Sequence, residues 1–166
     1  MSAPSSVPAR HAFVSNGATV YEWEQSVDDV TMHLSPPAGV RAADLDICLC
    51  SRCVRVGLRH GGTGGGPAPP PFLCAAPGGQ LSPPGCTWTL ADGRLEIVLA
   101  KARRGEAWSA ALAGHAPLDA AAAAADRRTL LLERFQAEHP GFDFRDAAIN
   151  GDVPDAREYL GGMPRG

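Results

Sequence analysis

Hydrophobic and polar residues alternate along two stretches that follow residue 18 of the chain. In the first stretch, Tyr21 and Trp23 share one face. In the second, Val30, Met32 and Leu34 share one face. Such alternation is typical of half-buried β-strands, because successive side chains of a strand point to opposite faces of the sheet. The pattern therefore predicts that the folded part of the chain begins with two strands.

Further strands are predicted as hairpins. Residues 45–50 and 53–59 alternate in the same way on either side of a two-residue connection. Residues 86–101 contain two strands joined through Asp92-Gly93, a pair that strongly favours a tight hairpin turn. With a shorter ordered stretch beyond residue 71, about seven strands are expected. Short strands separated by turns are typical of an antiparallel β-sandwich.

The remainder of the chain begins as a helix. Pro117 is acceptable at a first helical position, Asp119 suits the positive end of the helix dipole, and a run of alanines follows. Leu131, Leu132 and Phe135 give one apolar stripe, while the charged residues around them are expected to face solvent. We therefore predict an amphipathic helix with a short apolar face.

Aromatic and β-branched residues continue past the end of this helix. The proline-glycine pair after residue 139 cannot continue it. Phe142, Phe144 and Ile149 follow, whereas a disordered tail is normally short of such residues. With Phe135, they are expected to lie on a surface, either that of their own domain or that of a partner. This feature favours a binding protein over an enzyme.

The expected fold class is all-β, a seven-stranded antiparallel sandwich followed by a C-terminal α-helix and an extended tail. The expected divisions are a flexible leader over 1–17, the sandwich over 18–115 with a flexible glycine- and proline-rich loop over 60–71, the helix over 116–139, and the tail over 140–166.

Charge and composition exclude several classes of partner. The 166 residues carry a formal net charge of −3, with a sequence pI near 5.9, so no positive field attracts nucleic acid or an anionic membrane. No apolar stretch approaches the ~20 residues that span a bilayer. The N-terminal residues do not follow the pattern of a signal peptide, so the cytosol is the expected compartment.

The cysteines raise the question of a metal site. Five cysteines, an odd number, favour reduced thiols over a disulfide framework. Cys50 and Cys53 would face each other at the neck of a hairpin, with Cys48 nearby, as in half of a zinc site. The other two cysteines form no second close pair. We therefore favour small apolar fillers in strands, and we predict neither a metal nor a cofactor.

No catalytic motif is present in the sequence. It lacks the G-x-S-x-G pattern of a nucleophile elbow, and its glycine-rich segment lacks the neighbouring residues of a phosphate-binding or dinucleotide-binding loop. The five histidines are scattered along the chain. The protein is expected not to be an enzyme.

The aromatic and basic residues of the strands divide into two groups. Trp23 and Trp88 are expected in the core, because large aromatics dominate sandwich interiors. The second group consists of candidates for an exposed face that binds a partner; for its pair of consecutive arginines, a solvated strand end is the alternative interpretation. These candidates are Tyr21, Arg59, Lys101, Arg103 and Arg104.

Several of these segments match a known family in their order and spacing. The motifs are Tyr21-Glu-Trp23-Glu-Gln25, Thr87-Trp88-Thr-Leu90, Val98-Leu-Ala-Lys101 and Trp108. They resemble the CS domain that is shared by the NudC proteins and the small acidic co-chaperone of the ninety-kilodalton heat-shock protein. The segments 132–136, 140–144 and 149–151 look like the C-terminal signature of one NudC branch.

The resemblance implies a sandwich without catalytic residues, in which Trp23, Trp88 and Trp108 belong to the core signature. It also implies a non-catalytic co-chaperone or adaptor. Its partners would be the ninety-kilodalton heat-shock protein and clients such as the lissencephaly WD-repeat protein of the dynein pathway. Two alternatives are an independent holdase for unfolded proteins and a scaffold that recognises one folded propeller. The sequence does not determine the oligomeric state.

Overall fold

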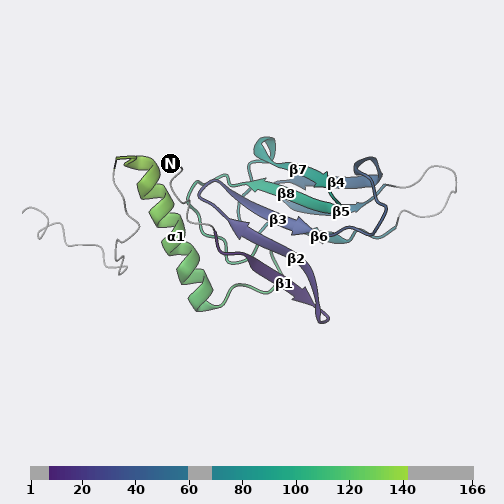
Figure 1. The fold of residues 1–166 in the computed structure, drawn as a ribbon, viewed down its shortest axis with the longest axis horizontal. Helices are drawn as coiled ribbons and strands as arrows, with labels where there is room; N and C mark the ends of the chain where they lie inside the picture. The colour runs from purple at the N-terminus through teal and green to yellow at the C-terminus, as the bar shows by residue number, and fades with distance from the viewer. Residues whose placement is uncertain (1–7, 60–68, 142–166) are drawn as a thin grey trace, which may run out of the picture.

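The computed structural model describes residues 8–59 and 69–141 of the chain, and it consists of two antiparallel sheets with one helix across an end of the sandwich (Figure 1). Five strands form one sheet in the order β1-β2-β3-β8-β7, and three form the other in the order β4-β5-β6. The strands are β1 His11–Ser15, β2 Ala18–Gln25, β3 Asp29–Leu34, β4 Leu45–Cys50, β5 Cys53–Leu58, β6 Leu73–Ala75, β7 Thr87–Ala91 and β8 Arg94–Ala100. The helix is α1, Ala120–Glu138, and two 3₁₀ turns span Ala42–Asp44 and Pro83–Gly85.

This architecture confirms the predicted all-β antiparallel sandwich with a C-terminal helix. The prediction of a flexible leader over 1–17 is wrong for β1, which pairs with β2 through the turn Asn16-Gly17. Both turn residues have positive φ, 52° and 76°, as a tight hairpin turn requires. The Asn-Gly pair was the signal for this extra strand. The described residues therefore form eight strands instead of the seven expected.

One row of inward-facing side chains crosses the larger sheet. Trp23 of β2 lies opposite Met32 of β3, and Met32 lies opposite Ile97 of β8. Trp88 of β7 lies opposite Ile97, and His11 of β1 lies opposite Trp23. Directly paired residues project from the same face of a sheet, so the period-two pattern of the sequence produces this row.

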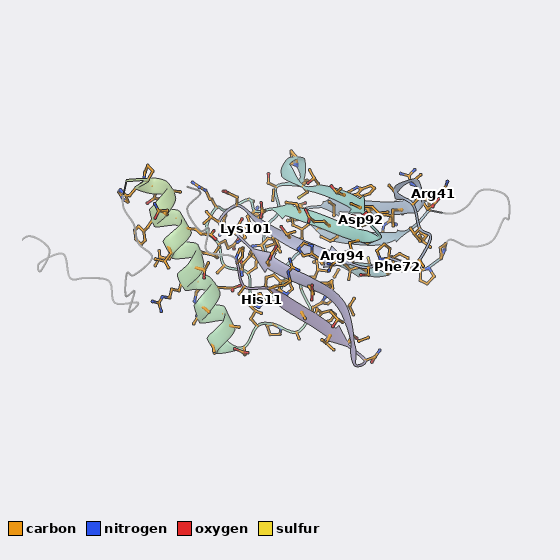
Figure 2. The ribbon with its side chains drawn as sticks, viewed as in Figure 1. His11, Arg41, Phe72, Asp92, Arg94 and Lys101 are labelled. Carbon is orange, nitrogen blue, oxygen red and sulfur yellow. The ribbon has the colours of Figure 1, made fainter. Side chains whose placement is uncertain are left out.

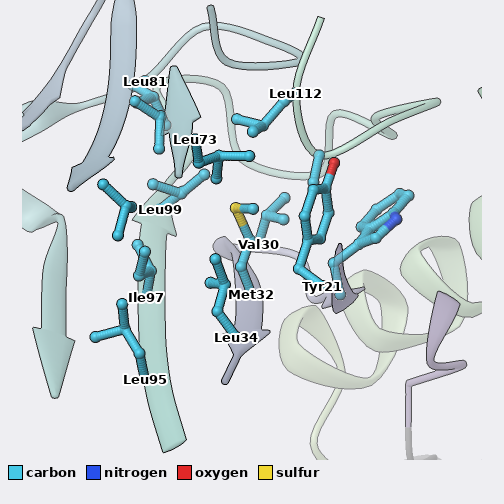
Figure 3. Close-up of a cluster of buried hydrophobic side chains, with 14 of the residues drawn as sticks. Tyr21, Val30, Met32, Leu34, Leu73, Leu81, Leu95, Ile97, Leu99 and Leu112 are labelled. Atoms are coloured by element: carbon cyan, nitrogen blue, oxygen red, sulfur yellow. The ribbon is translucent and has the colours of Figure 1, made fainter. Parts of the chain in front are cut away.

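The core fills the space between the two sheets. Figure 3 shows side chains of β8 lying beside those of β3, with Tyr21 at one side of the cluster. The predicted core positions of Trp23 and Trp108 are confirmed, with exposed fractions of 4% and 2%. Trp88 is half-buried and packs at the margin of the cluster. The most deeply buried large side chains are Tyr21, Met32, Leu45, Leu95, Ile97, Leu99 and Leu112.

The helix begins later than expected and uses a different face. Its N-cap is Asp119, whose carboxylate accepts the backbone N–H of Ala122, so Pro117 precedes the helix. Its buried residues are Asp126 and Leu130. The predicted apolar stripe is therefore wrong for Leu131 and Phe135, which are 37% and 38% exposed. The reason is that α1 packs across the end of the sandwich through a largely polar face.

Two consecutive glycines allow the Trp108 segment to pack closely. A Cβ atom on Gly79 would lie 2.2 Å from the indole nitrogen of Trp108, and a Cβ on Gly78 would lie 1.8 Å from the carbonyl oxygen of Ala110. Both distances are far below van der Waals contact. The backbone of Gly79 is therefore the surface on which Trp108 packs, and that of Gly78 is the surface on which Ala110 packs.

We predict that Gly79→Ala lowers the free energy of unfolding by at least about 2 kcal/mol, because the added methyl group overlaps a buried indole ring. Gly141→Ala is the matched control, since a Cβ there meets nothing within 4 Å. Urea unfolding monitored by tryptophan fluorescence measures both changes. Equal midpoints for the two variants would contradict the close packing of Trp108.

Candidate protein-binding site

The helix is joined to the sandwich by a buried carboxylate. The Oδ1 and Oδ2 atoms of Asp126 lie 3.0 and 2.9 Å from Nε2 of His11 on β1. Oδ2 of Asp126 also accepts a 2.6 Å hydrogen bond from Nε2 of Gln25, at the end of β2. All three side chains are largely buried, so these contacts fix the position of α1 against the five-stranded sheet.

The amide of Gln25 uses its full hydrogen-bonding capacity. Its Nε2 donates to Asp126 and, at 3.0 Å, to the carbonyl oxygen of Trp108. Its Oε1 accepts from the backbone N–H of Trp108 at 2.9 Å and from Nζ of Lys101 at 3.1 Å. Two donors and two acceptor positions are all that a glutamine amide offers. One side chain thus connects β2, the end of β8, the Trp108 segment and α1.

Lys101 belongs to this buried network, so its expected place on an exposed face is wrong. Besides Gln25, its Nζ donates to the carbonyl oxygens of Ser26 and Glu106, each at 2.7 Å. The residue is only 7% exposed, and burial lowers the pKa of its amine to about 8. Its charge therefore serves the joint between helix and sandwich and is not available to a partner.

Tyr21 is also in the core, contrary to the expected exposed position. It is 2% exposed, and its hydroxyl oxygen is hydrogen-bonded to Nδ1 of His115 at 2.7 Å. Phe13 stacks on the His115 ring with the ring centres 4.0 Å apart. Burial raises the pKa of the Tyr21 hydroxyl and lowers the pKa of His115, so both groups are favoured in their neutral forms.

The three candidate arginines lie at opposite ends of the sandwich. Arg59 follows β5, and its Nε donates to the carbonyl oxygen of Leu45 at 2.9 Å. Arg103 and Arg104 follow Lys101 near the helix, and Nε of Arg104 pairs with Asp28 at 2.8 Å. All three are exposed. The structure therefore does not bring the predicted basic residues together into one surface.

The predicted aromatic surface after the helix falls largely outside the described residues. Phe135 lies within α1, more than one third exposed. Phe142, Phe144 and Ile149 lie beyond residue 141 and are not described. Their role in binding stays a prediction.

An apolar groove lies at the end of the sandwich away from α1. Figure 2 shows Phe72, a residue of its wall, at that end of the molecule. The volume of the groove is about 290 Å³, and Phe72 is 43% exposed. Sequence reasoning missed this groove, because its residues come from five separate segments. The lining consists of Val20, Leu34, Ser35, Pro36, Pro37, Val56, Phe72 and Leu95.

The cysteine hairpin has the predicted geometry. Cys50 and Cys53 are paired on β4 and β5 across the connection Ser51-Arg52. Within residues 8–59 and 69–141, no group of three or more histidine, cysteine, aspartate or glutamate side chains is arranged to hold a metal ion. All five cysteines are free thiols.

Comparison with known proteins identifies the family. The model of the CS domain matches residues 19–101. The chain is 34% identical over 155 residues to NudC domain-containing protein 2 of Homo sapiens and of Mus musculus, covering 92% of this chain and 92% of each relative. The chain belongs to the CS-domain family of NudC-like proteins.

Two further similarities agree with this assignment. The nuclear movement protein nudc of Schizosaccharomyces pombe is 28% identical over 100 residues, covering 60% of this chain and 57% of that protein. The solution structure of the CS domain of the human KIAA1068 protein matches with a TM-score of 0.52 at 20% identity, covering 70% of this chain and 86% of that one. The second similarity supports the fold.

Among the described residues, no helix is long and apolar enough to cross a membrane.

The carboxylate of Asp126 is expected to hold α1 on the CS domain. We predict that Asp126→Ala lowers the free energy of unfolding by about 1–3 kcal/mol, because Gln25 loses a buried partner. Glu138→Ala is the control, since it removes only the exposed pair with Arg134 and should cost about 0.5 kcal/mol or less. Urea unfolding measures the stability, and hydrogen exchange of the α1 amides should accelerate only in Asp126→Ala. Unchanged exchange there would show that the helix is held by other contacts.

The buried amine of Lys101 predicts a pH dependence of stability. Burial lowers its pKa to about 8, although four carboxylates oppose this shift. An unfolded lysine keeps its proton up to about pH 10.4. Between these values the unfolded chain binds more protons, so the Lys101 contribution to stability is full above the unfolded pKa and is lost as the pH falls through about 8. The opposing carboxylates are those of Asp29, Glu106, Glu133 and Asp126.

The measurement compares the unfolding free energy of the native chain with that of Lys101→Met at several pH values under reducing conditions. The difference between them is expected to shift in favour of the native chain as the pH rises from about 8 to about 10. Tyrosine and cysteine ionisation is common to both proteins and cancels. Lys101 is the sole lysine, so a pH-independent difference would show that its amine titrates normally.

Proposed function

We propose that this CS-domain protein is a non-catalytic co-chaperone or adaptor that binds protein partners through the groove beside Phe72. Membership of the NudC-like family supports a co-chaperone-type role. The observation that carries the choice of surface is a partly exposed aromatic ring in the wall of an apolar groove. An aromatic side chain beside an apolar pocket is a common anchor of protein interfaces.

The size of the groove favours a segment of a protein over a small-molecule ligand. Its volume of about 290 Å³ lies at the lower limit of the roughly 300–1,000 Å³ of small-molecule pockets. It therefore accommodates a few apolar side chains. Pro36 and Pro37 stiffen one wall, which reduces the entropy lost on binding. Full burial of a large apolar side chain contributes roughly 1.5–3 kcal/mol before ordering costs.

Two of the described histidines, His11 and His115, have structural roles in the packing of the domain. His115 is hydrogen-bonded to the Tyr21 hydroxyl inside a stack of aromatic rings, and His11 binds the carboxylate that positions α1. Both side chains thus have structural partners in the packing of the domain. Neither lines the Phe72 groove.

The partners that we propose are the ninety-kilodalton heat-shock chaperone and a WD-repeat client of the dynein pathway. The proposed compartment of these interactions is the cytosol. The similarity to NudC domain-containing protein 2 over 92% of the chain supports this assignment. In this arrangement the groove would hold an apolar segment of one partner. The helix α1, on which Leu131 is exposed, lies at the opposite end of the domain. That end is therefore left for a second partner.

The groove is tested with Phe72→Ala in the full-length chain. Partners captured from cytosol on the native protein are identified by mass spectrometry, and their affinity is then measured with purified components. We predict at least a tenfold loss of affinity for one partner, which corresponds to about 1.4 kcal/mol. Val14→Ala is the matched control, because Val14 is 53% exposed on β1 and does not line the groove.

Equal affinity of Phe72→Ala and Val14→Ala would contradict the groove as the binding site. Capture of neither the heat-shock chaperone nor a propeller would contradict the proposed partners. In that case, suppression of the aggregation of arbitrary unfolded proteins would identify the chain as an independent holdase.

A further inference from the structure

Four cysteines gather on the outer face of the three-stranded sheet. In the register of β4 and β5, Cys48 lies opposite Arg55 and Cys50 lies opposite Cys53. In the register of β5 and β6, Arg55 lies opposite Cys74. Paired residues, and residues two apart on a strand, project from the same face. The four thiols therefore share one side of the sheet, around Arg55.

This face points away from the core. The alternate residues of the same strands, including Leu45, Val56 and Leu73, are buried between the two sheets. Cys48 and Cys74 are exposed, and Cys50 and Cys53 are half-buried. Reagents in solution can thus reach the thiols without unfolding of the domain.

Two of these sulfur atoms are in contact. Sγ of Cys53 lies 3.8 Å from Sγ of Cys74. Cys53 is placed diagonally to Cys74 across the β5–β6 pair, since Arg55 is the residue directly opposite. The right-handed twist of neighbouring strands brings one of the two diagonals closer. A disulfide needs the sulfurs at about 2.0 Å, and β6 is a three-residue edge strand that can shift toward β5.

We propose that Cys53 and Cys74 are a reversible dithiol pair that low-molecular-weight disulfides, such as oxidised glutathione, convert to an intramolecular disulfide. The exposed Cys74 thiolate attacks one sulfur of oxidised glutathione, which forms a mixed disulfide and releases one glutathione thiol. The Cys53 thiolate then attacks the Cys74 sulfur and releases the second glutathione. The protein loses two hydrogens, and one oxidised glutathione becomes two reduced molecules.

The surroundings of the pair favour this order of attack. Burial raises the pKa of the Cys53 thiol, and the neighbouring Cys74 thiol raises it further. Cys53 is thus the weaker nucleophile toward a reagent in solution, but it is already in contact with the sulfur that it must attack. A fixed neighbour of this kind makes the second step intramolecular and fast.

The bond would tie the edge strand β6 to β5. The two cysteines are 21 positions apart, so the disulfide closes the connection between these strands. Phe72 directly precedes β6, and Val56 of β5 also lines the groove. An effect of oxidation on partner binding would rest on the proposed function. Formation of the disulfide does not depend on the proposed function, and it is tested without a binding partner.

The experiment treats the reduced full-length protein with oxidised glutathione, alkylates the remaining thiols and maps the peptides by mass spectrometry without reduction. We expect two of the five thiols to be protected, a mass loss of about 2 Da, and a cross-linked peptide pair that contains Cys53 and Cys74. Dithiothreitol should restore all five thiols. The amides of β6 should exchange more slowly in the oxidised protein.

Single-cysteine variants distinguish the thiol that attacks glutathione, Cys74, from the thiol that closes the disulfide, Cys53. Cys53→Ser should accumulate glutathione on Cys74, because the resolving thiol is gone, whereas Cys74→Ser should form neither the adduct at this position nor the cross-link. Cys86→Ser is the control, since Cys86 lies outside the pair and contacts the carbonyl oxygen of Ser82; it should oxidise like the native chain. Circular dichroism confirms that each variant is folded.

Three outcomes would overturn the proposal. They are full alkylation of the native chain after oxidation, a cross-link between Cys50 and Cys53 in place of the expected one, and a disulfide between two copies of the protein. Because the mapping is made on the native chain, a variant that fails to fold does not affect it.

Discussion

The side-chain amide of Gln25 is the contact on which the arrangement of this domain depends. Its four hydrogen bonds join β2 to Lys101, to both backbone groups of Trp108 and to Asp126 of α1. These groups are separated by up to 101 positions in the sequence. A buried amide stabilises a structure most when each of its polar atoms has a partner, so the loss of any one of these groups weakens the whole joint.

This joint explains why a charged helix packs on an apolar sandwich. The face of α1 that meets the domain carries Asp126 and Glu133, and Glu133 accepts the backbone N–H of Val27 at 3.1 Å. Burial raises the pKa of Glu133, while that hydrogen bond opposes the rise. Polar contacts of this kind fix the orientation of a helix more tightly than apolar contacts, because each bond has a required direction. One end of the sandwich is thereby closed, and the groove remains at the other.

The sequence predicted those features that depend on neighbouring residues. Period-two alternation located the strands, and Asp92-Gly93 located a hairpin. The helix was also predicted, but its expected start at residue 116 lay before the observed N-cap, Asp119. The position of Lys101 could not be predicted in this way, because its acceptors on Ser26 and Gln25 are about 75 positions away. A lysine at a strand end is normally exposed, and only the fold reveals that three acceptors surround this one.

The groove and the outer face that carries the four cysteines are also formed by residues that are distant from one another in the sequence. Neither lies within one segment, since each is assembled by strand register. The spacing of Cys50 and Cys53 predicted their pairing across a turn, but it gave no reason to add Cys74, which β6 brings to the same face. Alternation makes the two faces of a strand independent: the inner positions must satisfy the core, and the outer positions are free to differ. The chemistry that distinguishes this chain is therefore expected on outer faces and edges, where a substitution leaves the packing of the sandwich unchanged.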